Sequence, residues 1–207
     1  MLSYFDKRVP EILKLGFREE AIVPLKTFLQ LLWETNEQLN LVSRKMTAEE
    51  LIDNHVIDCL LPLKYFPKKI KTVADFGTGG GLPGIIYALQ FPDIKFRLYE
   101  KSHLKQDFLN RCKILTKNIK VEGDIPLQLH DVDLVMARGF KPLDVLLDMS
   151  RDFYLKTGSY FLLKARREKI DDEILLAKKK FKDLNCQIQT LHSPVLEVER
   201  HLVQIHC

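Results

Sequence analysis

The stretch VADFGTGGGLPG, residues 73–84, decides the fold of this chain. It opens with a short apolar run of the kind that forms a buried strand. The glycines that follow let the backbone turn sharply, and Pro83 is suited to the first turn of a helix. The stretch therefore predicts a strand, a tight glycine-rich loop and a helix, in that order.

The chain after residue 70 continues this alternation of strand and helix. Short apolar runs, which predict strands, lie at 73–76, 94–99, 132–137 and 160–163. Helical spacing of apolar residues covers 82–90, 103–117 and 142–151. The alternation predicts an α/β fold with a parallel sheet covered by helices. Two further runs, 186–191 and 201–205, are joined by a short loop without a helix, which predicts an antiparallel hairpin at the sheet edge.

The chain before residue 68 has a helical pattern. Pro24 lies near a helix start, and an apolar face follows at steps of three and four, formed by Leu25, Phe28, Leu29, Leu32 and Trp33. Thr47-Ala48-Glu49-Glu50 has the form of a capping box, which starts another helix. We therefore expect an N-terminal helical extension over 1–67, packed on a Rossmann-like domain over 68–207.

Length and composition limit the class of protein. A chain of 207 residues with 46% hydrophobic content can bury one sizeable core. Because it has neither an apolar run of membrane-spanning length nor a signal-peptide pattern, we expect a cytoplasmic protein with no membrane partner and no required oligomer. A net charge of +4 weakly favours a polyanionic partner. The chain has no Cys-x-x-Cys pair, so its four cysteines do not suggest a metal or redox site. They are Cys59, Cys112, Cys186 and Cys207.

The glycine-rich loop is of a kind that binds nucleotides, and its spacing admits two cofactors. Gly79-x-Gly81-x-x-Gly84 satisfies the dinucleotide fingerprint, and Glu100 follows the second run, where the ribose hydroxyls of either cofactor would be held. Asp75 completes the pattern Asp-x-Gly-x-Gly-x-Gly, which is typical of methyltransferases. The C-terminal strand pair also fits a methyltransferase sheet better than an all-parallel one. S-adenosylmethionine is therefore the expected cofactor, and an NAD-dependent dehydrogenase, for which no hydride-transfer acid or base is evident, is the less favoured alternative.

Several ordered motifs give a more specific resemblance. They are the loop at 77–85, Asn40-Leu41-Val42-Ser43, His55-Val56-Ile57-Asp58, Ala137-Arg138-Gly139-Phe140, Leu163-Lys164 and Glu199-Arg200-His201-Leu202-Val203. In this order, from about Trp33 to Ile205, they resemble the glucose-inhibited division protein B family of bacterial methyltransferases. The resemblance implies a class I methyltransferase fold and methylation of guanine N7 in small-subunit ribosomal RNA.

The resemblance also implies which residues bind the cofactor and the RNA. Together with the glycine loop and Glu100, the expected cofactor-binding set is Gly77, Thr78, Gly79, Leu82, Glu100, Ile125, Pro126 and Arg138. The residues expected to face the ribosomal RNA or subunit are Asn40, Lys164 and Arg200. Asp124-Ile125-Pro126 stands where the family has an Arg-x-Glu pattern. This departure motivates a second hypothesis, an RNA-binding ribosome-assembly factor on a degenerate methyltransferase fold.

The implied chemistry needs few reactive side chains. Guanine N7 has an exposed lone pair and no proton to remove, so its methylation depends on positioning and needs no general base. We therefore expect neither a catalytic residue nor a metal ligand set. Because the guanine ring becomes cationic, Arg138, Lys164 and Arg200 are expected to bind phosphate, the cofactor carboxylate or guanine O6. His55 lies on an apolar helical stripe and is expected to be a packed histidine rather than a substrate contact.

Overall fold

The computed structural model describes residues 1–43 and 45–206, so Cys207 lies outside the described residues. Within them, seven strands form one sheet in the order β3-β2-β1-β4-β5-β7-β6. The strands are β1 (Thr72–Phe76), β2 (Lys95–Tyr99), β3 (Ile119–Glu122), β4 (Leu134–Arg138), β5 (Ser159–Lys164), β6 (Cys186–Leu191) and β7 (Arg200–His206). β1 to β5 are parallel, whereas β7 runs antiparallel to both β5 and β6. The predicted α/β sheet and C-terminal hairpin are confirmed, with β6 at the edge.

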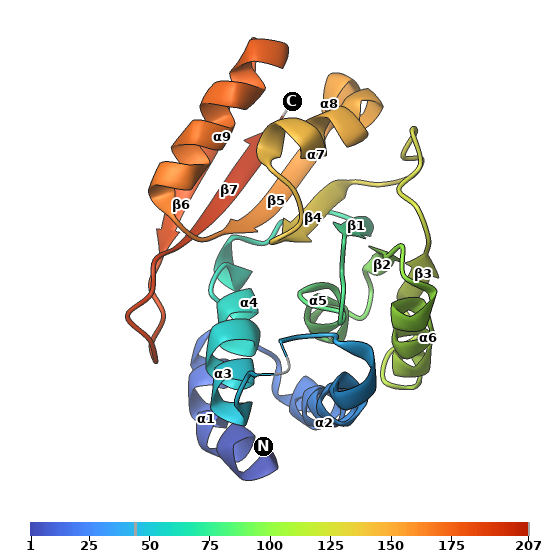
Figure 1. The fold of residues 1–207 in the computed structure, drawn as a ribbon, viewed down its shortest axis with the longest axis vertical. Coiled ribbons are helices and arrows are strands. Elements are labelled where there is room, and N and C mark those ends of the chain that lie inside the picture. The colour runs from blue at the N-terminus through green and yellow to red at the C-terminus, as the bar shows by residue number, and fades with distance from the viewer. Residues whose placement is uncertain (44, 207) are drawn as a thin grey trace.

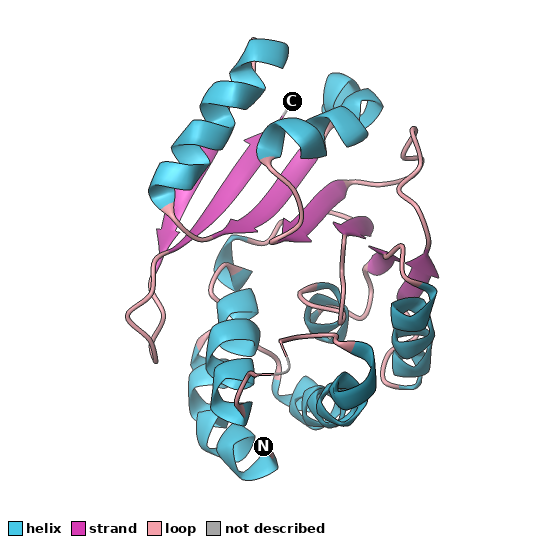
Figure 2. Cartoon of the chain, in the orientation of Figure 1, coloured by secondary structure: helices cyan, strands magenta, loops and turns pink. Residues whose placement is uncertain are grey.

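Helices cover both faces of the sheet (Figures 1 and 2). One face carries the N-terminal helices, α5 (Gly84–Gln90), α6 (His103–Arg111) and its 3-10 continuation η4 (Cys112–Ile114). The other face carries α7 (Leu143–Met149), α8 (Arg151–Thr157) and α9 (Arg167–Lys180). Successive residues of a strand point to opposite faces, so Leu134 and Met136 join the first buried cluster and Val135 joins the second.

The N-terminal part is helical, as predicted. Its elements are α1 (Leu2–Lys14), η1 (Glu19–Ala21), α2 (Ile22–Leu39), α3 (Ala48–Leu51), the π-helical turn η2 (Ile52–Ile57), α4 (Asp58–Leu60) and η3 (Leu63–Tyr65). The capping box is confirmed, because Thr47 N donates to Glu50 Oε2 at 2.8 Å and Glu50 N donates to Thr47 Oγ1 at 3.2 Å. These hydrogen bonds satisfy amides that the start of a helix leaves free.

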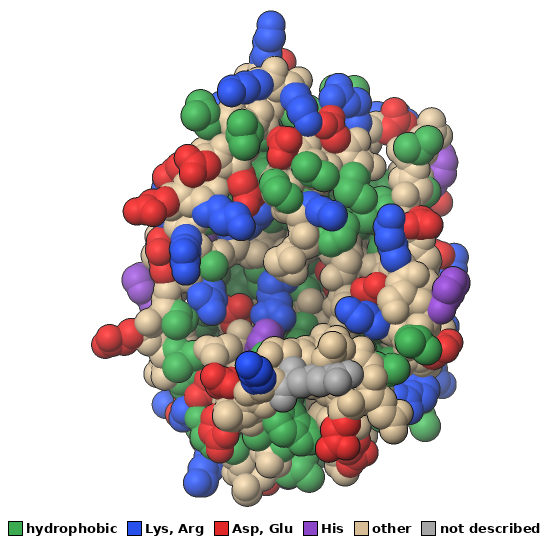
Figure 3. Space-filling view, in the orientation of Figure 1, with side chains coloured by type: hydrophobic (Ala, Val, Ile, Leu, Met, Phe, Trp, Pro, Cys, Tyr) green, Lys and Arg blue, Asp and Glu red, His purple; other side chains and the backbone are tan. Residues whose placement is uncertain are grey.

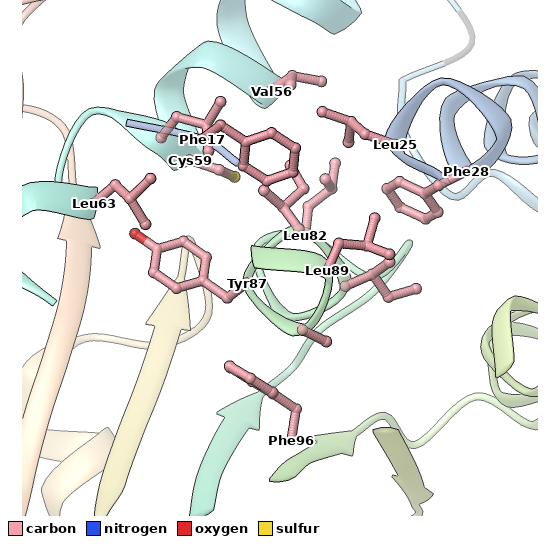
Figure 4. Close-up of a cluster of buried hydrophobic side chains, with 14 of the residues drawn as sticks. Phe17, Leu25, Phe28, Val56, Cys59, Leu63, Leu82, Tyr87, Leu89 and Phe96 are labelled. Atoms are coloured by element: carbon pink, nitrogen blue, oxygen red, sulfur yellow. The ribbon is translucent and has the colours of Figure 1, made fainter. Parts of the chain in front are cut away.

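The N-terminal helices and the sheet share one buried cluster. Leu25 and Phe28 of α2 are fully buried, and Figure 4 shows them beside Leu82 and Leu89 from the α5 region. Trp33, expected in the core, is partly buried against this cluster. The division into 1–67 and 68–207 stays a prediction.

The apolar runs do not indicate β3. Its residues, Ile119-Lys120-Val121-Glu122, alternate between apolar and charged, and only Ile119 is fully buried. β3 lies at the edge of the sheet, where one side of the strand has no neighbour and charged side chains are tolerated. An edge strand therefore carries a weaker apolar signal than β1 or β4.

None of the helices in the described part of the chain combines the length and apolar character needed to cross a bilayer. Nor do these residues include a group of three or more His, Cys, Asp or Glu side chains that could hold a metal ion.

Candidate functional site

The glycine-rich loop connects β1 to α5 and has the left-handed backbone that glycine permits. Gly77, Gly79 and Gly81 have φ values of +65°, +58° and +87°. A Cβ at Gly77 would lie 2.1 Å from Phe140 Cδ2, so a ring from the loop after β4 packs directly on this backbone. A Cβ at Gly79, by contrast, would meet nothing nearer than Gly77 O at 3.9 Å. The loop is therefore closed on its Phe140 side and open to a ligand at Gly79.

Asp75 anchors the end of the loop to the sheet. Its Oδ2 accepts a hydrogen bond from Gly84 N at 3.0 Å, and a Cβ at Gly84 would come within 2.5 Å of the same oxygen. Burial raises the pKa of Asp75 to about 6, although the hydrogen bond from Gly84 N and the charge of Arg138 oppose the rise. The requirement for glycine at position 84 follows from this close approach of a buried carboxyl group.

Glu100, directly after β2, lies against the same loop. Its Oε2 accepts from Gly79 N at 3.1 Å and its Oε1 accepts from Ser102 N at 2.9 Å. Each carboxylate oxygen has a second lone pair, so both can still accept a hydrogen bond from a ligand hydroxyl.

The loop that contains Ile125 and Pro126 follows β3, the neighbour of β2. Glu100 N donates to Glu122 O at 3.1 Å, and Lys101 pairs with Asp124 at 3.2 Å. The structure thus brings the glycine loop, Glu100 and the start of the 125–126 loop to one edge of the sheet, the carboxyl ends of β1, β2 and β3. Ligands of open α/β sheets bind at this edge.

A cavity of about 700 Å³ lies farther along the same edge, beside the ends of β4 and β5. Arg138 ends β4, Lys164 ends β5, and Arg200 begins β7, and all three line the cavity. Because β7 is antiparallel to β5, Lys164 pairs with His201, and Arg200 lies next to this pair. Figure 3 shows the hollow near the middle of the face, with cationic side chains and a histidine inside it.

Asp58 joins two of these cations. Arg138 Nη1 lies 3.4 Å from Asp58 Oδ2, and Arg200 Nε donates to Asp58 Oδ1. The Asp58 side chain is only 11% exposed, and those of Arg138 and Arg200 are 18% and 22% exposed. A second pair forms nearby, where Lys164 Nζ donates to Glu173 and to Lys141 O. The deep cations are therefore paired with carboxylates.

His55 completes the cavity wall from the π-helical turn, a type of turn frequent at functional sites. Arg138 Nη2 donates to His55 Nδ1 at 2.8 Å. A guanidinium can only donate, so Nδ1 is the acceptor and the imidazole proton is on Nε2. Burial, followed by the charges of Arg138 and Arg200, lowers the pKa of His55 to about 4, so the ring is neutral near pH 7.

The pKa of His55 predicts a stability change in acid. As the pH is lowered from about 6.5 to about 4, the unfolded chain takes up a proton at His55 that the folded chain does not. The free energy of unfolding therefore falls as the pH falls. Asp75, with a pKa of about 6 when folded and an ordinary value of 3.8, contributes in the opposite direction. Replacing His55→Gln should therefore leave the variant less sensitive to acid than the wild type. Urea unfolding across this range measures the difference, and parallel pH curves would contradict it.

The structure divides the expected site residues between two places. Gly77, Thr78, Gly79, Leu82 and Glu100 belong to the loop and its edge, whereas Lys164 and Arg200 line the cavity. Arg138 lines the cavity too, and Phe140, two residues after it, both lines the cavity and packs on Gly77, so the two places meet at the end of β4. Asn40 is outside the cavity, at the end of α2 with a φ of +53°. The next residue, Leu41, packs on the glycine loop, because a Cβ at Gly80 would lie 3.3 Å from Leu41 Cβ.

Two acids at the cavity, Asp58 and Glu173, are absent from the expected site residues. Asp58 closes the motif His55-Val56-Ile57-Asp58, so its place in an ordered motif was an available signal. Glu173 carries no such signal, because its role depends on how α9 packs against α7. It accepts from Leu143 N at 3.1 Å as well as from Lys164, and is 7% exposed.

The chain is similar to a described family and to named relatives over most of its length. The model of a family described as rRNA small subunit methyltransferase G matches residues 21–203. Ribosomal RNA small subunit methyltransferase G 1 of Bdellovibrio bacteriovorus is 62% identical over 205 residues, which cover 99% of this chain and 100% of that protein. Ribosomal RNA small subunit methyltransferase G of Brachyspira hyodysenteriae is 31% identical, with 86% and 87% of the two chains covered.

A solved structure supports the fold alone. A predicted O-methyltransferase from Agrobacterium tumefaciens superposes with a TM-score of 0.55 at 20% identity, covering 72% of this chain and 79% of that one. The ordered match over most of the sequence goes further than this shared architecture. Since the family model spans residues 21–203 and the Bdellovibrio relative aligns along almost the whole chain, this chain belongs to the rRNA small subunit methyltransferase G family, the glucose-inhibited division protein B family.

Proposed function

We propose that this protein transfers a methyl group from S-adenosylmethionine to N7 of a guanine in small-subunit ribosomal RNA. The observation that carries the proposal is the family match over residues 21–203. The structure supports it with an open glycine loop beside a cation-lined cavity on one sheet edge. Ribosomal RNA makes the cytoplasm the expected place of action, and one chain supplies both the loop and the cavity, so no second copy is required.

The loop edge suits S-adenosylmethionine. The open backbone at Gly79 leaves room for the cofactor, and Glu100 offers two acceptor oxygens for ribose hydroxyls. Ile125 and Pro126 would flank the adenine, and Gly77, Thr78 and Leu82 would contact the methionine end. The bound cofactor supplies an electrophilic methyl group on a sulfonium.

The cavity suits a nucleotide taken out of an RNA stack. Guanine N7 needs no general base, so the chain's task is to place the base and exclude water. Arg138, Lys164 and Arg200 are held by carboxylates, whereas Lys141, Arg166 and Lys169 on the rim are exposed and form no ion pair among the described residues. The rim cations would contact phosphates, which contribute affinity without reading sequence.

The direct test is nucleoside mass spectrometry of small-subunit RNA from cells with and without the protein. The proposal expects one 7-methylguanosine to disappear and to return when the gene is restored. An unchanged 7-methylguanosine content would contradict it. The assembly-factor alternative expects no methyl transfer by the purified protein, and the dehydrogenase alternative expects binding of NAD in place of S-adenosylmethionine.

Replacing Glu100→Ala is expected to weaken S-adenosylmethionine binding by about tenfold to a hundredfold, because the ribose hydroxyls lose a charged acceptor. Titration calorimetry measures the affinity. Asp133→Ala is the matched control, since Asp133 Oδ2 accepts from Lys71 N and Thr72 N at 2.7 and 2.9 Å at the opposite end of β1. Equal affinity losses in both variants would show that Glu100 acts only on loop stability.

A further inference from the structure

The imidazole of His55 has one ring nitrogen free for a ligand. Nδ1 accepts from Arg138, which leaves Nε2–H as the donor. Among the described residues, none accepts a hydrogen bond from Nε2, and this nitrogen is not among the enclosed polar atoms that lack a partner. His55 also lines the cavity. The cavity wall therefore presents an uncharged N–H donor.

Most of the other side-chain donors that line the cavity are cations, the exceptions being Asn54 and His201. Arg138, Lys164 and Arg200 carry full charges that Asp58 and Glu173 offset only in part. Burial and the two guanidinium groups keep His55 neutral, since its pKa is lowered to about 4. Transfer of a methyl group to N7 makes the purine ring cationic, so a neutral donor beside the ring opposes the reaction less than a guanidinium would.

The edge of guanine that carries N7 also carries O6, and both atoms are acceptors. Adenine has N7 at the same place but a donor amino group on C6. An N–H donor directed at that position forms a hydrogen bond with O6 of guanine. When the purine has a 6-amino group, the same donor faces a second donor and no hydrogen bond forms. One hydrogen-bond donor can thus discriminate between the two purines.

We propose that His55 Nε2–H donates a hydrogen bond to O6 of the target guanine and thereby selects a 6-oxopurine. The inference rests on the proposed function and names the group that reads the base. Arg138 holds the imidazole through Nδ1, and Asp58 holds Arg138 in turn. His55 is a specificity-determining residue in this scheme, and it takes no proton from the reaction.

The experiment compares three RNA substrates that differ only at the methylated position. Guanine carries O6, inosine keeps O6 and lacks the 2-amino group, and 2,6-diaminopurine keeps N7 but has a 6-amino group. The full chain is assayed with S-adenosylmethionine, and kcat/KM is determined for each RNA. The wild type is expected to methylate guanine and inosine within a few-fold of each other and 2,6-diaminopurine about tenfold to a hundredfold more slowly, because a donor is left unpaired.

Two variants test the residue. His55→Ala removes the donor and should reduce the preference for guanine over 2,6-diaminopurine to a few-fold. His55→Gln keeps an acceptor for Arg138 in its amide oxygen and thereby turns its amide NH2, also an uncharged donor, to the base, so it should keep most guanine activity and most of the preference. Because glutamine is close to histidine in size, His55→Gln still tests the assignment if His55→Ala does not fold. His206→Gln is the control, since His206 is exposed at the end of β7 and contacts Ser159.

The possible results separate the two proposals. A preference as large as that of the wild type in His55→Ala, or the loss of the preference in His55→Gln, with guanine still methylated, would overturn the assignment and leave the proposed function intact. A wild-type protein that transfers no methyl group to guanine would overturn the proposed function and the assignment together. A general loss of activity with an unchanged preference would also contradict the assignment, because a purely structural role lowers all three rates alike.

Discussion

Replacement of Gly77→Ala is expected to weaken S-adenosylmethionine binding at least tenfold and to lower the free energy of unfolding by about 2 to 4 kcal/mol. Two costs add. The φ of +65° is strained for any residue with a Cβ, and that Cβ would lie 2.1 Å from Phe140 Cδ2. The ring or the loop must move, and both adjoin the expected methionine site. Calorimetric titration and urea unfolding measure the two effects.

The control for Gly77 is Gly16→Ala. Gly16 also has a left-handed backbone, with a φ of +93°, but a Cβ there would meet nothing within 4 Å. It should lose about 1 kcal/mol of unfolding free energy and bind the cofactor normally. If Gly77→Ala binds S-adenosylmethionine as the wild type does, the close contact with Phe140 does not shape the cofactor site.

Replacement of Asp58→Asn is expected to reduce kcat/KM for RNA about a hundredfold, because small displacements of positioning groups have effects of this size. Asp58 bridges Arg138 and Arg200, and its charge offsets theirs. Without it the two guanidinium groups repel, and Arg138 no longer has a fixed position from which to hold His55. Affinity for S-adenosylmethionine should fall less than kcat/KM, since the glycine loop and Glu100 keep their contacts and Arg138 alone among the expected cofactor-binding residues loses its partner. Steady-state kinetics with saturating cofactor, together with a binding titration, separate the two effects.

A matched control exists on α7. Asp148 also bridges two cations, Arg151 at 2.6 Å and Lys180 at 2.5 Å, but its side chain is 34% exposed and does not line the cavity. Asp148→Asn should cost less than about 1 kcal/mol and leave methyl transfer unchanged. Equal kinetic losses in the two variants would show that Asp58 has no special role at the site.

The N-terminal segment shows how far sequence reasoning reaches. The capping box at Thr47 and Glu50 was predictable because both hydrogen bonds form within one helical turn. The expectation for His55 was a packed residue, because a helical stripe shows that a side chain faces the protein and not what it meets there. The stripe predicts an α-helix, whereas the chain forms a π-helical turn at Ile52–Ile57. In the fold this turn presents His55 to the cavity beside Arg138.

What the sequence alone determined are the features with a local cause: a strand before Gly77, a left-handed glycine loop, Asp75 before it and Glu100 after the next strand. Glycine conformation, helix capping and strand alternation depend on neighbours within a few residues, so their patterns can be read directly. Only the tertiary structure decided that Asp58 pairs with Arg138 and Arg200, residues 80 and 142 positions away along the chain. These contacts require the order of strands in the sheet and the antiparallel insertion of β7 beside β5. Such long-range packing follows from how the whole core is buried, which no short stretch of sequence specifies.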